Sequence, residues 1–202
     1  MLAEDGILKQ HYLNLVPLVY SQLISYITGR NLLGNVWKLN YMNRELIFKE
    51  ADANDSVFIK ELMTEHWGGE PLVIRGKNYY PSTLNGIMVL DNKKVIGFLF
   101  YDIQDRVCEI VVFEIFEKFQ GIGTVVLEKL KVIAKNKQCN KLYLMTTNDN
   151  LEALRFYQKR GFHICGIHLD SVKVSRKMKP CIGETGDYGI PVRDEIDLEF
   201  LL

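Results

Sequence analysis

Hydrophobic and polar positions alternate in several short stretches after residue 45, and this alternation predicts β-strands. The predicted strands in the first half of the chain are 45–51, 71–76, 86–91, 95–103 and 107–115. Short polar turns, "NKK" and "QDR", join the last three of these strands. Strands joined by such short turns predict an antiparallel meander.

Apolar residues recur at helical spacing in three segments, 56–67, 124–137 and 150–160. Asp55 or Ser56 can cap the first helix, and Gly68 with Gly69 can end it. Further strands are predicted at 141–147, 162–169 and 193–202, and "LDSVKVSRKMKP" reads as a basic surface helix or connector. A meander followed by alternating helices and strands predicts an α/β or α+β fold, with helices flanking one mixed sheet.

The N-terminal segment, residues 1–44, is predicted to be a helical extension ahead of a domain that covers 45–202. Polar residues and a proline interrupt its apolar run, which therefore falls short of the ~20 uninterrupted apolar residues of a membrane helix. It also lacks a basic start and a small-residue cleavage site. We expect it to pack on the domain or on a second copy, which makes a homodimer possible. Met42 is an equally good candidate for the natural start of the protein.

The charge of the chain is balanced, because 25 Lys and Arg residues face 25 Asp and Glu residues. This balance favours neither nucleic acid nor a membrane as partner. The four cysteines show no Cys-x-x-Cys spacing, so we expect no metal site and no disulfide framework. Buried, reduced thiols in a cytoplasmic protein are the simplest interpretation.

A glycine-containing loop, "QGIGT", lies between a predicted strand and a predicted helix. It is not a Walker A loop, and Val126 stands where a dinucleotide-binding loop has its third glycine. Gly121 and Gly123 would let a pyrophosphate approach the N–H groups at the helix start, and Lys118 can add a positive charge. A tight turn without any ligand is equally typical of such a pair of glycines.

Four segments carry a specific resemblance: "CEIVVFEI", "KFQGIGT", "LYLMTTN" and "NLEALRFYQKRGF". Together they resemble the core of the GNAT acetyltransferase superfamily, and the resemblance extends over residues 45–202. It implies a mixed, mostly antiparallel sheet whose strands 107–115 and 141–147 splay around acetyl-CoA. Lys118 stands where the family more often has Arg or Gln. The implied cofactor-binding residues are Val112, Phe113, Lys118, Gln120, Gly121, Ile122, Gly123, Thr124, Asn150, Ala153 and Phe156.

The resemblance also implies catalytic residues. Tyr157 matches the family tyrosine that protonates the leaving thiolate, and a phenol is protonated at neutral pH. Glu109 matches a glutamate that some members use as a base toward the acceptor amine. Strand alternation puts Glu109 on one face with Phe113, and the fallback base Glu114 on the other. Hydrophobic neighbours of Glu109 would raise its pKa, as suits a base.

The acceptor site is expected in "TEHWGGEPLVIRG", where Trp67 offers a flat contact surface and Arg75 a fork for a carboxylate. A core tryptophan and solvated charges remain the alternative. The sequence thus predicts an N-acetyltransferase that moves an acetyl group from acetyl-CoA to a primary amine of a small or amino-acid-like molecule, by direct attack in a ternary complex. A protein lysine or N-terminal acetyltransferase, or a non-catalytic acyl-CoA sensor, are the alternatives.

Overall fold

The computed structural model describes residues 36–41, 44–118 and 120–202, which belong to one compact unit over 35–202. The helices predicted before residue 36, and Met42, lie outside the described residues. The end of the predicted helical extension is wrong, because Val36–Tyr41 form strand β1. β1 pairs antiparallel with β2 (Arg44–Glu50), and the alternation of "VWKLNY" suits such a strand. The sheet therefore starts before residue 45.

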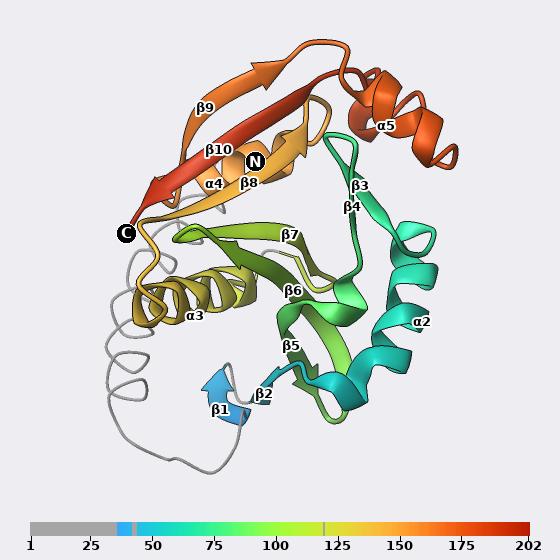
Figure 1. Ribbon diagram of the computed structural model, residues 1–202. Coiled ribbons are helices and arrows are strands. Elements are labelled where there is room, and N and C mark those ends of the chain that lie inside the picture. The colour runs from blue at the N-terminus through green and yellow to red at the C-terminus, as the bar shows by residue number, and fades with distance from the viewer. Residues whose placement is uncertain (1–35, 42–43, 119) are drawn as a thin grey trace, which may run out of the picture. The chain divides into compact units, whose positions relative to one another are not determined.

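The described strands form one eight-stranded sheet in the order β1-β2-β5-β6-β7-β8-β10-β9 (Figure 1). Its later members are β5 (Asn85–Asp91), β6 (Lys94–Gln104), β7 (Val107–Ile115), β8 (Lys141–Thr147), β9 (His163–His168) and β10 (Glu195–Leu201). Neighbouring strands run antiparallel except β7 and β8, which are parallel. The predicted meander is confirmed as β5–β6–β7, and so is the mixed, mostly antiparallel sheet.

β7 and β8 pair over only part of their length. Their register runs from Val107 opposite Lys141 to Ile110 opposite Leu144, although the strands continue to Ile115 and Thr147. Beyond these pairs, the facing backbone groups of the two strands are not hydrogen-bonded to each other. The expected splay of these strands is therefore confirmed.

A β-bulge in β7 changes which side chains share a face. Phe100 lies opposite Val112 and Tyr101 lies opposite Ile110, so Val111 is an extra residue. An extra residue inverts the alternation of everything after it. Glu109 and Glu114 consequently share one face, and the prediction that they lie on opposite faces is wrong.

The Glu109 face is covered by α2 (Ser56–Trp67) and by a separate hairpin of β3 (Leu72–Ile74) and β4 (Lys77–Tyr79). Gly68 ends α2 in the left-handed conformation, at φ 66°, as predicted. Buried apolar side chains of α2 and the hairpin pack on those of the sheet: Ile59, Leu62, Met63, Leu72, Ile74, Tyr79, Met88, Phe98, Phe100, Val111 and Val112. This core fixes the hairpin beside β7.

The basic segment after β9 forms α5 (Val172–Met178), which confirms the helical alternative. The following residue, Lys179, donates from Nζ to the carbonyl oxygens of Gly69 (2.6 Å) and Pro71 (3.1 Å). These bonds tie the end of α5 to the loop between α2 and β3.

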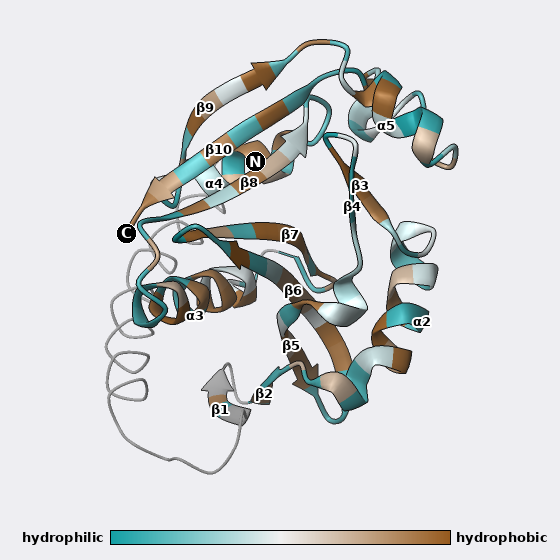
Figure 2. Ribbon diagram, viewed as in Figure 1, coloured by the Kyte–Doolittle hydropathy of each residue, from teal (hydrophilic) through white to brown (hydrophobic). Residues whose placement is uncertain are grey.

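The opposite face of the sheet carries α3 (Ile122–Asn136) and α4 (Leu151–Gln158), so α2 and α3 lie on opposite sides of β5–β7 (Figure 1). Apolar residues of α3 face the sheet, including Val126, Leu127, Leu130 and Ala134, none of which exposes measurable surface. In Figure 2 the middle of the meander is mostly brown, whereas β10 is banded in brown and teal along its length. The difference marks β10 as apolar on one face and polar on the other.

None of the described helices is long and apolar enough to cross a membrane. All four cysteines are free; Cys108 and Cys139 are buried, but Cys165 and Cys181 are exposed. The prediction of buried thiols is wrong for the latter two. Cys165 lies on β9, the last strand in the sheet order, where most side chains are exposed.

Candidate active site

The glycine loop forms the start of helix α3. Gly121 has φ 80°, in the left-handed region that favours glycine. Thr124 N donates to Gly121 O over 2.9 Å and closes the first turn, so the amides of Ile122 and Gly123 precede the intrahelical bonds. Such amides, at the positive end of a helix dipole, suit a phosphate group. The residues present therefore fit a pyrophosphate.

Gly123 lets α3 and α4 approach each other closely. A Cβ atom at Gly123 would lie 3.3 Å from Cε2 of Phe156 and 3.5 Å from Cγ1 of Ile115. The Phe156 ring contacts two further side chains, the Arg160 guanidinium 3.7 Å from its centroid and the Phe113 ring edge-on at 5.8 Å. The second glycine is thus favoured by close packing, whereas the first is favoured by its left-handed backbone conformation.

Two arginines that the sequence analysis missed hold side chains of the loop. Arg44 Nη1 donates to Gln120 Oε1 (3.3 Å) and to Glu117 Oε2 (2.6 Å). The hydrogen bond from Arg44 is the main reason that the pKa of Glu117 is lowered. Arg160 Nε donates to Thr124 Oγ1 over 3.0 Å. The two polar residues that flank the glycines, Gln120 and Thr124, are therefore already oriented by the chain itself.

Asn150 caps helix α4, because its Oδ1 accepts a hydrogen bond from Ala153 N (3.0 Å). This hydrogen bond gives Asn150 a structural role at the start of α4. Lys118 is exposed, and its positive charge interacts with the carboxylate of Glu152 in the first turn of α4. The pKa of Glu152 is lowered chiefly by the hydrogen bond from Arg155, and Lys118 adds to this effect.

Tyr157 lies in an apolar, aromatic environment on α4. It is 6% exposed, and its ring contacts those of Phe156 (5.1 Å between centroids) and Phe162 (5.2 Å). Burial raises the pKa of Tyr157 well above the ordinary value, because the phenolate would lose its hydration. The side chain therefore keeps its proton and can act as a donor.

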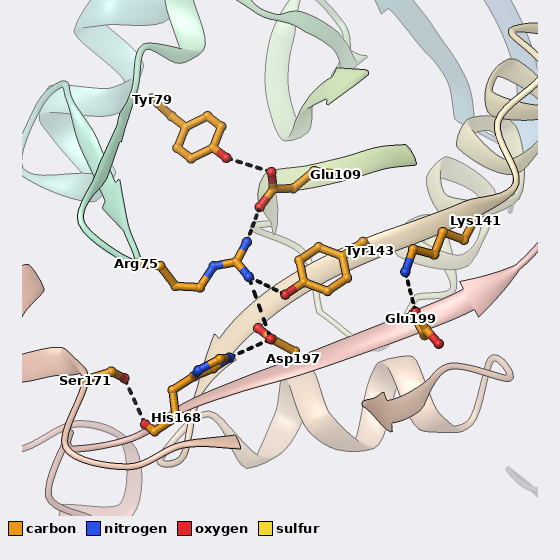
Figure 3. A network of polar contacts seen from close by, with 9 residues as sticks. All are labelled: Arg75, Tyr79, Glu109, Lys141, Tyr143, His168, Ser171, Asp197 and Glu199. Carbon is orange, nitrogen blue, oxygen red and sulfur yellow. Dashed lines mark hydrogen bonds and ion pairs between the residues drawn. The ribbon is translucent and has the colours of Figure 1, made fainter. Parts of the chain in front are cut away.

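Glu109 is surrounded by polar groups on the other face of the sheet (Figure 3). Its Oε2 accepts from Tyr79 Oη (2.6 Å), and its Oε1 accepts from Arg75 Nη2 (3.3 Å). The expected hydrophobic environment of this carboxylate is thus wrong, because the bulge and the β3–β4 hairpin bring a phenol and a guanidinium to it. Glu114, on the same face, accepts from Trp67 Nε1 (2.7 Å). Trp67 is 41% exposed and is not a core residue.

The network continues from Arg75 to residues that the sequence analysis did not select (Figure 3). Arg75 Nη1 donates to Tyr143 Oη (2.6 Å) and lies 3.7 Å from Asp197 Oδ2. His168 Nε2 lies 2.6 Å from the same Asp197 oxygen. Burial, and next the hydrogen bond to Asp197, raise the pKa of Tyr143. Arg75 therefore directs its fork at groups of the protein itself.

A sequence signal for Asp197 existed. Glu195, Asp197 and Glu199 alternate along β10 with the apolar Ile196, Leu198 and Phe200. A row of carboxylates on one face is ordinary for an exposed strand, but β10 lies inside the sheet, between β8 and β9. Only the strand order turns this pattern into a candidate functional face.

Val112 and Phe113 follow the bulge directly and point to different sides. Val112 is buried in the core beneath α2, whereas Phe113 contacts Phe156 of α4. The backbone at these two residues therefore belongs to the part of β7 that does not pair with β8. Glu109 lies on one face of the sheet, and Tyr157 of α4 lies on the other.

Comparisons with known proteins agree with this arrangement. A family model described as "Acetyltransferase (GNAT) family" matches residues 56–162. Two uncharacterized proteins of Bacillus subtilis (strain 168), YxbD and YdhI, are 35% and 33% identical over 139 residues, which cover 68% of this chain and 87% of each protein.

Solved structures of acetyltransferases are similar to this chain as well. An IAA acetyltransferase from Bacillus cereus ATCC 14579 aligns with a TM-score of 0.62 and 24% identity, over 78% of this chain and 99% of that one. A GNAT family acetyltransferase from Elizabethkingia anophelis, solved with acetyl-CoA bound, aligns with a TM-score of 0.56 and 25% identity, over 78% and 98%.

Proposed function

The chain belongs to the GNAT acetyltransferase family, and from this premise we propose that it transfers an acetyl group from acetyl-CoA to a primary amine. The proposed acceptor is a small or amino-acid-like molecule, and the amine attacks directly within a ternary complex. One observation carries the proposal. The pairing of β7 with β8 stops at Ile110 and Leu144, and the helix that follows β7 begins at the glycine loop.

Acetyl-CoA would be held by groups on the α3 and α4 side of the sheet. Its pyrophosphate would be bound by the backbone amides of Ile122 and Gly123 and by the positive charge of Lys118. The unpaired backbone of β7 and β8 offers hydrogen bonds to its amide arm, as a sheet edge does to an added strand. Ala153 and Phe156 flank this path. When bound, the cosubstrate supplies an acetyl group activated as a thioester.

The chain's own residues then move two protons. Glu109 accepts one from the acceptor ammonium, directly or through a water molecule, which frees the nitrogen lone pair to form the new C–N bond. Tyr157 donates its phenolic proton to the sulfur as the C–S bond breaks, and the second proton that the nitrogen loses on becoming an amide restores the Tyr157 hydroxyl. Backbone N–H groups around Phe113 stabilise the negative charge on the acetyl oxygen.

The acceptor would approach from the Glu109 face, past Trp67 and Arg75. These residues come from the end of α2 and from the β3–β4 hairpin, which border that face. Glu109 and Glu114 lie beneath them and accept hydrogen bonds from Arg75 and Trp67. Trp67 and Arg75 are therefore proposed to limit which acceptors reach Glu109.

Thiol release from acetyl-CoA across a panel of acceptors tests this proposal. The panel contains simple amines, amino acids, polyamines, aminoglycosides and peptides, and each product is identified by its mass. We expect turnover with one class of small amine. Turnover with peptides alone would favour a protein acceptor. Acetyl-CoA binding without turnover on any acceptor would favour a non-catalytic sensor and contradict the proposal.

A further inference from the structure

We propose that the acceptor carries a second positive charge, as a diamine or polyamine does, and that Asp197 binds this charge while Glu109 faces the reacting amine. The proposal rests on the amine acetylation proposed above and names its substrate class.

The sheet face beside the splay of β7 and β8 is acidic. It carries Asp102 on β6, Glu109 on β7 and Asp197 on β10. Among the described lysines and arginines, those that contact these carboxylates come from the β3–β4 hairpin. Arg75 lies 3.3 Å from Glu109 and 3.7 Å from Asp197, and Lys77 lies 3.9 Å from Asp102. The sheet thus supplies negative charge, and a separate element neutralises it.

Asp197 has an unused hydrogen-bonding position. The residue is 6% exposed, and its Oδ1 is buried without a hydrogen-bond partner among the described residues. The contacts of this carboxylate with Arg75 and His168 are made by its other oxygen, Oδ2 (Figure 3). A buried carboxylate oxygen without a donor is costly to the folded protein and points to a ligand that donates there.

Arg75 occupies the place where a ligand cation would bind. Its guanidinium lies between the carboxylates of Glu109 and Asp197 and donates to the Tyr143 hydroxyl. It reaches this position from the turn of the hairpin, with φ 50° and a side chain that is 37% exposed. The second ammonium of the acceptor can exchange with this partly exposed guanidinium and take over its contact with Asp197.

The same geometry disfavours two other ligands. An acceptor carboxylate would be repelled by the negative charges of Glu109 and Asp197. Arg75 would not attract it strongly, because Arg75 already pairs with both of these carboxylates. Within the described part of the chain, no group of three or more His, Cys, Asp or Glu residues is arranged to hold a metal ion. The geometry therefore favours an organic cation.

Three acceptors of equal chain length test the inference in the wild-type protein. 1,4-Diaminobutane, butylamine and 4-aminobutyrate share the reacting amine and differ only in the far group, which is positive, neutral or negative. We expect kcat/KM in thiol release from acetyl-CoA to be about tenfold higher for the diamine than for butylamine, the effect of one charge-assisted hydrogen bond. We expect 4-aminobutyrate to be the poorest of the three.

Two substitutions on β10 localise the preference. Asp197→Asn is expected to lower kcat/KM about tenfold more for the diamine than for butylamine, so that the preference disappears. Glu199→Gln is the matched control, because Glu199 lies two residues away on the same strand and pairs with Lys141 (2.7 Å). This variant should keep the wild-type ratio.

The two levels of the proposal fail differently. Thiol release with equal rates for diamine and butylamine, or faster release with 4-aminobutyrate, would overturn the charge site and leave the acetyltransferase intact. A diamine preference that survives in Asp197→Asn would overturn the role of that residue. Acetyl-CoA binding without thiol release for any amine would overturn the proposed function, and the inference with it.

Discussion

Tyr157 and Glu109 are surrounded by opposite kinds of groups. The tyrosine is enclosed by the rings of Phe156 and Phe162, which exclude water and favour its neutral form. The glutamate receives hydrogen bonds from Tyr79 and Arg75, which orient both of its oxygens. One side chain is therefore suited to keep a proton until sulfur leaves, and the other to receive one at a fixed position.

The raised pKa of Tyr157 has a consequence for the pH–rate profile. Because burial disfavours the phenolate, deprotonation moves to higher pH than the ordinary value of about 10. Activity should therefore not decline through Tyr157 at any pH below about 10. A decline of kcat with a midpoint below about pH 9 that is absent in Tyr157→Phe would contradict this prediction.

Glu109→Gln tests the base directly. The amide keeps the size of the side chain but cannot accept the acceptor's proton, so we expect kcat/KM at neutral pH to fall by about 10²–10⁴-fold. Tyr79→Phe is the control, because it removes one hydrogen bond to Glu109 and keeps the carboxylate; a loss below about tenfold is expected. Near-normal activity of Glu109→Gln would mean that the network only stabilises the fold.

Residues with a local motif could be predicted from the sequence, whereas residues that act through tertiary contacts could not. The sequence predicts Gly121, Gly123 and the segment around Tyr157, because the start of a helix and the spacing of its residues are local properties. Asp197 is 88 residues away from Glu109 in the chain, and Arg44 is 76 residues away from Gln120, although each pair belongs to one network of contacts in the fold. No periodicity within one element reports such a contact.

At the scale of elements, the splay of β7 and β8 and the start of α3 form one feature. The bulge at Val111 reverses the faces of β7 just where its pairing with β8 ends. In the sequence this stretch is an unbroken apolar run, "IVV", which has no alternation to reveal an extra residue. This is why the strand bounds were predictable but the common face of Glu109 and Glu114 was not.

Alanine substitutions separate the two glycines of the loop. Gly121→Ala should cost about 1–2 kcal/mol of unfolding free energy, because an L-residue is strained at φ 80°. Gly123, the second residue of α3, is not among the glycines with positive φ, so its stability loss should be smaller.

The expected effect of Gly123→Ala is on binding instead. The new methyl group, 3.3 Å from Phe156, requires that ring or the start of α3 to shift by a few tenths of an ångström, so acetyl-CoA affinity should fall by up to about tenfold. Denaturant unfolding and calorimetric titration measure the two effects. Unchanged affinity in Gly123→Ala would show that the packing of these helices does not position the loop.

At the scale of the whole molecule, the compact unit over 35–202 contains every residue of the proposed site. β1 lies at one end of the strand order, and four strands, β2, β5, β6 and β7, separate it from β8. Catalysis should therefore depend little on the N-terminal residues, whose predicted role is in assembly or solubility.

Two truncations test this separation. Removing residues 1–34 keeps β1, and we expect acetyl-CoA affinity within about twofold of the full chain, with a change in oligomeric state or solubility seen by light scattering. Removing residues 1–41 also deletes β1 and leaves β2 as an uncovered edge, so more aggregation is expected. Loss of acetyl-CoA binding after removal of residues 1–34, with the fold preserved, would contradict the domain division.

The central claim is that Tyr157 protonates the leaving sulfur during acetyl transfer. The most direct measurement is acetyl-CoA-dependent thiol release by the wild type and Tyr157→Phe, with acetyl-CoA affinity measured for both. We predict that the variant binds acetyl-CoA normally and loses about 10²–10⁴-fold in kcat, as expected for the removal of a general acid. Equal kcat values at equal affinity would contradict the claim and assign Tyr157 to the aromatic core alone.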